Sequence, residues 1–214
     1  MSDIEQVYKS PESDLFIEEP VPTSFKQGKF SKSKLQIAGW FSLFYIFLLV
    51  PVTWISVMSA LQGDSYPYSA EALYLGAALT AVWIYLILVM KSLLNERFDF
   101  DLANKYINLQ VMLSVPMAVL SIFMDNNGSD FGIISIVYFI LLVAIGIVTI
   151  LFGKQLLKIS TRYSGLKLYA WTNIISGVCM ASIILIFLAI PAGIVSSIAM
   201  AIMFFSAAKE LCAE

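Results

Sequence analysis

The sequence predicts an all-α membrane protein with six transmembrane helices arranged as three antiparallel hairpins. Apolar residues make up 59% of its 214 residues and charged residues only 13%, whereas a soluble domain is about 45–50% apolar and about 25% charged. Six apolar segments follow a polar leader, and all 13 Lys and Arg residues can be placed on one side of a bilayer. A membrane is therefore the expected solvent for most of the chain.

Residues 1–33 form a polar tail, and residues 34–214 form the expected membrane domain. The tail is acidic in its first part, basic in its second part, and low in hydrophobicity, which predicts an extended or disordered segment. The basic lysines are Lys26, Lys29, Lys32 and Lys34. They border the first apolar segment, where anionic headgroups would attract them. That segment is too long for a signal-peptide core, so we expect an uncleaved anchor.

Each apolar segment has about 17–27 residues, which is the length a helix needs to cross a bilayer. The expected spans are Leu35–Leu61, Ala72–Met90, Tyr106–Met124, Gly132–Phe152, Leu168–Ile190 and Ala192–Ala208. Pro51 and Pro116 predict kinks in the first and third spans. Pro191 and the small residues after it predict a tight turn between the last two spans. The mixed segment Ser92–Asn104 is expected to be a solvated loop, with a short interfacial helix as the alternative.

The charges predict the orientation of the chain. Lys and Arg occur only in the tail, in alternate connections and after the last span. The opposite connections carry Asp64, Glu71, Asp125 and Asp130 and no basic residue. Because basic residues stay on the cytoplasmic side, we expect both termini there. The alternative makes the last two spans one broken re-entrant segment with five crossings, which would leave Lys209 outside.

An internal repeat is a further prediction. Leu35–Trp40 resembles Leu166–Trp171, each at the start of an odd-numbered span, and Asn104–Leu109 is a weaker third copy. The alternative is that topology alone places lysine and tryptophan at membrane interfaces.

Enzyme chemistry has little support in this sequence. The chain has no His, which is the commonest general base and metal ligand. No Asp, Glu, Lys or Arg lies at the middle of an expected span, so proton relays are disfavoured. Cys179 and Cys212 suggest neither a disulfide framework nor a metal site. A net charge of −2 gives no reason to expect nucleic-acid binding. We therefore expect no enzyme, no cofactor and no metal.

Polar residues within the spans form a candidate pocket. Asn108 and Gln110 lie near the cytoplasmic end of the third span, and Thr172 and Asn173 lie at the matching end of the fifth. One hypothesis joins them in a shared pocket at the cytoplasmic mouth. The favoured alternative is hydrogen bonding between helices, which contributes about 0.6 kcal/mol on average.

Small residues recur at four-residue spacing and predict close helix packing. The candidates are Gly177 and Ala181 in the fifth span and Gly193, Ser197 and Ala201 in the sixth. Such stripes let helix backbones approach closely, because lipid provides no hydrophobic drive for association. Packing within one chain is favoured, and a homo-oligomer is the alternative.

The tail carries one family resemblance. The segment Tyr8-Lys-Ser-Pro11-Glu-Ser-Asp14-Leu15 resembles the leader before the first span of many uncharacterised multi-span inner-membrane proteins of proteobacteria. The resemblance implies a bacterial inner membrane and a short docking peptide, for which Tyr8, Pro11 and Leu15 are the candidates. The alternative is a solvated tail without a partner.

The sequence thus predicts a non-enzymatic accessory or interaction protein of the inner membrane, with the tail available to a cytoplasmic or membrane protein partner. The alternative is a small transporter or lipid-handling protein whose path lies between the hairpins. A continuous polar cavity would favour transport, and a sealed bundle would favour the accessory role.

Overall fold

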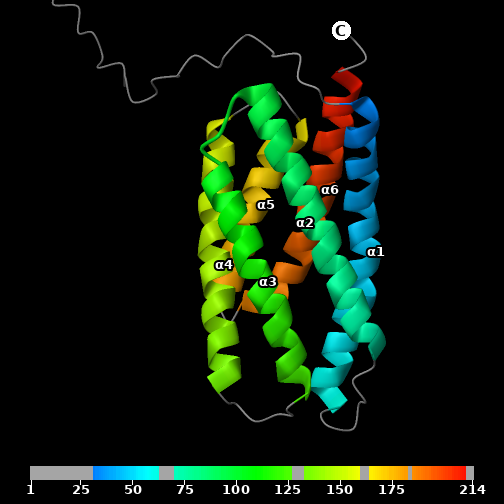
Figure 1. Cartoon of the computed structure of the whole chain (residues 1–214), viewed down its shortest axis with the longest axis vertical. Helices are drawn as coiled ribbons and strands as arrows, with labels where there is room; N and C mark the ends of the chain where they lie inside the picture. Colours follow the sequence, from blue (N-terminus) through cyan, green and yellow to red (C-terminus); the bar gives the residue numbers. More distant parts are fainter. Residues whose placement is uncertain (1–30, 63–69, 127–132, 160–163, 183–184, 211–214) are drawn as a thin grey trace, which may run out of the picture.

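Six α-helices form in the part of the chain that the computed structural model describes, namely residues 31–62, 70–126, 133–159, 164–182 and 185–210. The helices are α1 Lys32–Gln62, α2 Ala70–Phe98, α3 Asn104–Asn126, α4 Ile133–Lys158, α5 Ser164–Ala181 and α6 Ile186–Glu210 (Figure 1). The expected all-helical class is confirmed.

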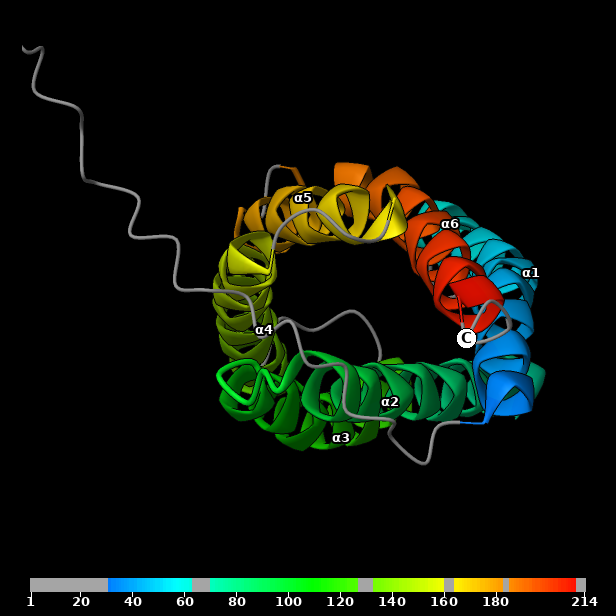
Figure 2. The ribbon, with the colours of Figure 1, turned by 90° about the horizontal axis from the view of Figure 1, so that it is seen from above.

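The helices make one closed ring. Each helix packs against its neighbours in the chain, and α6 closes the ring by packing against α1 (Figure 2). Consecutive helices run in opposite directions, as short connections between helices require. The start of α1 and the end of α6 therefore lie at the same end of the ring (Figure 1). No helix lies on the axis of the ring, so opposite helices do not touch.

Glycines allow the closest approaches between neighbouring helices. A Cβ added to Gly177 of α5 would lie 2.6 Å from the carbonyl oxygen of Gly146 of α4. A Cβ added to Gly165 of α5 would lie 2.5 Å from the Ala199 carbonyl of α6. Backbones this close gain van der Waals contact, which drives helix association where lipid replaces water.

One contiguous apolar cluster takes side chains from all six helices. Its largest fully buried members include Phe152 of α4 and Phe204 of α6. The other helices contribute Leu35, Met90, Leu93, Leu94, Ile107 and Leu166. These residues come from the starts of the odd-numbered helices and the ends of the even-numbered helices. The cluster therefore fills one end of the ring.

The expectation of a solvated loop over Ser92–Asn104 is wrong for residues 92–98, and only residues 99–103 lie between helices. Helix α2 continues to Phe98, and Leu93 and Leu94 are fully buried in the core. The helix ends at Phe98. The next residue, Asp99, has a φ of 50° in the left-handed region, and the Phe100 N–H donates to the Leu94 carbonyl. The charges of this segment concealed its buried face, because hydropathy averages over all faces of a helix.

The expected turn at Pro191 is also wrong. Helix α5 ends at Ala181, before the expected boundary at Ile190, and Pro191 lies inside α6. It falls in the second turn of α6, where a missing N–H costs one hydrogen bond near the helix start. Pro51 and Pro116 likewise lie inside continuous helices, α1 and α3.

The two stronger copies of the predicted repeat occupy equivalent environments. Leu35 and Leu166 are buried at the starts of α1 and α5, and Trp40 and Trp171 are exposed. In the third copy, Ile107 is buried and Leu109 is exposed. The two stronger copies thus share one pattern at the start of a helix, namely a buried leucine followed five residues later by an exposed tryptophan.

Candidate functional site

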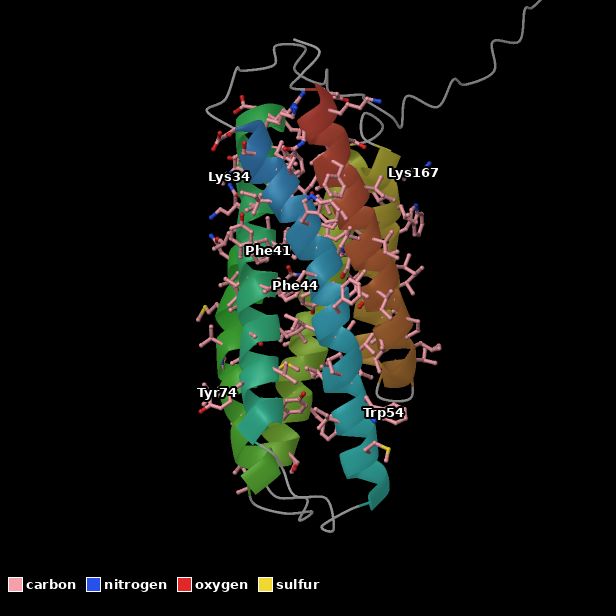
Figure 3. All side chains as sticks on the ribbon, turned by 90° about the vertical axis from the view of Figure 1, so that its right-hand side faces the viewer. Lys34, Phe41, Phe44, Trp54, Tyr74 and Lys167 are labelled. Carbon is pink, nitrogen blue, oxygen red and sulfur yellow. The ribbon has the colours of Figure 1, made fainter. Side chains whose placement is uncertain are left out.

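The described basic residues all lie at one end of the ring, which we call the basic end, and the opposite end is the far end. They are Lys32, Lys34, Lys91, Arg97, Lys105, Lys154, Lys158, Lys167 and Lys209. Lys34 and Lys167 lie at one level, although they come from α1 and α5 (Figure 3). The remaining Lys and Arg residues lie outside the described residues. This alignment makes the ring strongly asymmetric in charge.

Exposed aromatic side chains lie at a second level, near the far end of the ring. Trp54 of α1 and Tyr74 of α2 point outward near the far end (Figure 3), with exposed fractions of 65% and 71%. Lys34 and Trp54 are about twenty residues apart, which corresponds to about 30 Å of helix. That distance matches the hydrocarbon thickness of a bilayer, and tryptophan and tyrosine are typical of its boundaries. Four helices, α1, α2, α4 and α6, are long and apolar enough to span it.

Burial is confined to the half of the ring nearest the basic end. On α1 the last buried residue is Ser42, on α2 the first is Leu86, and on α3 the last is Gln110. On α4 burial begins at Leu142, on α6 it begins at Ser197, and on α5 it reaches Cys179, two residues before the helix ends. Every described residue beyond these limits toward the far end is at least partly exposed. The fully buried side chains therefore lie toward the basic end, and the described side chains nearer the far end are partly exposed.

Two glycines test whether the far half has space inside. Gly76 of α2 lies eleven residues before the buried Ile87, and Gly193 of α6 lies eleven residues before the buried Phe204. Eleven residues make about three turns, so each glycine continues the buried face of its helix. A Cβ added at either glycine would meet no atom within 4 Å. Each of these two glycines thus has open space beside it on the continuation of its helix's buried face.

The four residues of the predicted polar pocket do not come together. Asn108 is exposed, and its Oδ1 accepts a hydrogen bond from Lys91 Nζ at 2.8 Å. Thr172 and Asn173 are buried but donate to the Tyr169 carbonyl of their own helix. Gln110 is buried and donates to Thr149 Oγ1 of α4 at 3.0 Å. Hydrogen bonding within and between helices accounts for these contacts, and α3 and α5, which carry the two halves of the predicted pocket, do not touch.

Gln110 has a further property that the sequence did not show. Its Oε1 is buried and accepts no hydrogen bond from any described group. A buried amide oxygen without a donor costs about 1–3 kcal/mol. Gln110 is also the last buried residue of α3 toward the far half. The side chain therefore places an acceptor without a protein partner at the limit of burial on α3.

The predicted packing residues behave in two ways. Gly177 and Ala181 lie against Gly146 of α4, so the fifth helix uses its small residues for close contact. On α6, Ser197 and Ala201 are buried, and Ser197 Oγ donates to the carbonyl of Gly193. Gly193 itself lies beyond the limit of burial, toward the far end. The stripe on α6 therefore crosses from buried to partly exposed positions.

A polar link at the basic end was not predicted. Arg97 of α2 donates to the Ala207 carbonyl at 3.2 Å and forms an ion pair with Glu210 at 3.1 Å, both on α6. The backbones of α2 and α6 are not in contact. The Arg97 side chain therefore bridges two helices that do not pack directly, and it is only 8% exposed.

Other candidate chemistry is limited in the described part of the chain. No group of three or more His, Cys, Asp or Glu side chains there could hold a metal ion. Cys179 is a buried free thiol. The candidate docking residues Tyr8, Pro11 and Leu15 lie outside the described residues. No known protein family, no curated protein and no solved structure matches this chain.

Proposed function

We propose that this chain is a non-enzymatic lipid-handling protein of the bacterial inner membrane, which holds an apolar chain of a lipid in the far half of its ring. The observation that carries the proposal is the confinement of burial to the basic half. A bundle that served only as a scaffold would gain stability by filling its core along its whole length. Space on the inner face instead favours a bound molecule.

The chemistry of the inner face suits an apolar ligand. Continuing the buried faces of three helices into the far half brings Leu49 of α1, Met117 of α3 and Tyr138 of α4 onto those faces. These positions are mainly apolar and carry no Asp, Glu, Lys or Arg. An acyl chain gains about 0.8 kcal/mol per buried CH₂ in such surroundings.

Membrane placement supports the same proposal. Four helices can span a bilayer, and α3 and α5 lie between pairs of these helices in the ring. Embedding the four therefore carries the other two to the same depth. We propose that the basic end faces the cytoplasm, with the N- and C-termini on that side, because basic residues are retained there.

The test is the number of lipids that stay bound after purification. Gly76→Phe and Gly193→Phe would fill space on the inner face. Ala78→Phe and Val195→Phe are matched controls, because both residues are exposed on the same helices. Native mass spectrometry of the full chain in detergent should show retained phospholipid in the wild type and the controls. The two inner-face variants should retain clearly less.

Two results would overturn the proposal. A wild-type chain that keeps no phospholipid after detergent exchange would lack the ligand. Equal retention in all four variants would place bound lipid on the outer surface instead. Melting temperatures of the variants separate loss of lipid from loss of fold.

A partner for the tail stays a separate prediction. Deleting residues 1–20 removes Tyr8, Pro11 and Leu15 and spares the basic stretch Lys26–Lys34. If the tail docks a protein partner, the truncated chain should insert normally and lose that partner from pull-downs. Recovery of the same partners by both chains would contradict docking.

A further inference from the structure

Two lysines and an asparagine meet on the surface where α2 and α3 pack together. Lys91 Nζ of α2 donates to Asn108 Oδ1 of α3 at 2.8 Å. Lys105 precedes Asn108 by three residues, and both are exposed, so their side chains are neighbours on one face of α3. We call Lys91, Lys105 and Asn108 the α2–α3 cluster. It carries two positive charges.

The α2–α3 cluster has more hydrogen-bond donors than the described protein groups accept. A lysine ammonium group has three N–H donors, and Lys91 donates one of them to Asn108. The Lys105 ammonium group and the Asn108 amide nitrogen donate to no described group. No described carboxylate forms an ion pair with either lysine, including Asp101, which lies four residues before Lys105. The described part of the chain therefore gives the cluster no counter-ion.

The depth of Lys91 makes a counter-ion valuable. Lys91 lies seventeen residues after Tyr74 on α2, which corresponds to about 25 Å of helix. Tyr74 lies near the far boundary of a hydrocarbon layer about 30 Å thick, so Lys91 lies about 5 Å inside the boundary at the basic end. A charged side chain at such a position is costly unless it has a polar partner. Anionic lipid headgroups lie directly outside that boundary.

An exposed apolar stripe continues from the cluster toward the far end. Met112, Val115 and Val119 follow the two cluster residues of α3 at spacings of three or four residues, which places all of them on one helix face. The three apolar side chains are 72%, 51% and 47% exposed. Ile107 and Gln110, on the opposite face, are buried. The stripe therefore lies on the outside of the ring.

We infer that the α2–α3 cluster binds the phosphate group of an anionic phospholipid in the leaflet at the basic end, and that an acyl chain of this lipid lies along Met112, Val115 and Val119. The phosphate oxygens accept hydrogen bonds from the two ammonium groups and from the Asn108 amide. From Asn108 to Val119 the stripe is eleven residues, or about 16 Å, which is about half the hydrocarbon thickness and so the depth of one leaflet. This lipid lies on the outside of the ring, so the inference does not rest on the proposed function.

The test titrates the purified full chain in detergent with phosphatidylglycerol, which is anionic, and with phosphatidylcholine, which has no net charge. Native mass spectrometry measures the binding. The wild type should bind phosphatidylglycerol more tightly. The double variant Lys91→Gln/Lys105→Gln should bind it roughly thirtyfold more weakly, because each lysine near an anionic headgroup contributes about fivefold in affinity. Lys158→Gln/Lys209→Gln is the matched control, since it removes two exposed lysines from the same end of the ring, and its affinity should stay near that of the wild type.

Asn108→Asp tests the same site without removing a lysine. A carboxylate in place of the amide gives Lys91 a counter-ion within the chain. Binding of phosphatidylglycerol should therefore fall, whereas the melting temperature without lipid should not. Undiminished binding by Asn108→Asp, or equal effects of the two double-lysine variants, would overturn the inference. Displacement of phosphatidylglycerol by inorganic phosphate, compared with chloride at the same ionic strength, would overturn a lipid as the occupant.

These measurements are separable from the test of the proposed function. Gly76→Phe and Gly193→Phe should leave the affinity of the cluster for phosphatidylglycerol unchanged. The cluster variants should leave lipid in the far half in place. Failure of the cluster variants to weaken binding would reject only this inference, and failure of the glycine variants to lower lipid retention would reject only the proposed function.

Discussion

At the scale of single residues, the glycines separate two environments that look alike in sequence. Gly177 supports the closest contact between α4 and α5, whereas Gly76 continues a buried face into open space. Both lie in apolar helices beside other small residues. Only the neighbouring helix decides whether a methyl group can be added.

Gly177→Ala should lower the stability of the protein by about 1–3 kcal/mol, because the added Cβ would lie 2.6 Å from the Gly146 carbonyl oxygen. Gly76→Ala is the matched variant, and it should stabilise by about 0.5–1 kcal/mol because alanine favours a helix over glycine. Thermal unfolding in detergent measures both. Equal effects of the two substitutions would contradict the difference in environment.

The Gln110–Thr149 hydrogen bond gives a second prediction at this scale. Thr149→Val should destabilise by about 1–3 kcal/mol, because it leaves the buried Gln110 amide without its partner on α4. The same substitution in a Gln110→Leu background should cost clearly less, since no amide is then left unsatisfied. Unfolding of the two single variants and the double variant completes the cycle. Additive effects would show that the hydrogen bond contributes nothing.

At the scale of elements, α2 and α6 are joined by a side chain rather than by their backbones. Glu210→Gln should cost only about 0.5 kcal/mol, because Glu210 is 40% exposed and an exposed ion pair is screened by water. Arg97→Gln should cost about 1–3 kcal/mol, since the buried hydrogen bond to Ala207 is also lost. Melting temperatures at low and high salt test this order, and salt should reduce the Glu210 effect by a larger fraction than the Arg97 effect, because the Arg97 hydrogen bond to Ala207 is lost at any salt concentration.

Helix α6 gives a further prediction. Ser197→Leu should lower the melting temperature, because Ser197 is buried where burial begins on α6. Ile198→Leu is the matched control, since Ile198 is 40% exposed on the same helix. An unchanged melting temperature for Ser197→Leu would place this face of α6 against lipid.

At the scale of the whole molecule, charge and burial share one axis. The basic residues and the filled core lie at the same end, so the end that we propose faces the cytoplasm also holds the fully buried side chains. The three prolines inside described helices, Pro51, Pro116 and Pro191, all lie in the far half. Each removes a backbone hydrogen bond, which leaves the far half easier to bend than the basic half.

This axis predicts the topology. Reporters fused at Glu214 or attached at Ser164 should be cytoplasmic, and labels at Ser65 and Asn127 should be on the far side. A label at Ala192, which lies inside α6, should be shielded from water on both sides. A reporter at Glu214 that reads on the far side would reject the shared placement of the chain ends.

Much of the fold could be predicted because hydropathy and charge are properties of local sequence. The helices overlap the expected spans, but most extend beyond them, as α2 does from Met90 to Phe98. Hydropathy detects the hydrocarbon layer and not the helix, so it misses turns that continue into the interface. The candidate site was harder to predict from the sequence, because the predicted pocket residues Asn108 and Gln110 lie on different faces of one helix.

The sequence by itself determined that the chain is helical and apolar enough for a membrane, and that its basic residues can share one side. These features depend on residue type and spacing alone. Only the tertiary structure decided where α5 ends, that α6 closes the ring on α1, and that burial stops partway along each helix. Those features depend on contacts between residues far apart in the chain, such as Gly146 with Ala181 and Gly39 with Phe205. Apolar residues that fill a core and apolar residues that line open space obey the same hydropathy pattern.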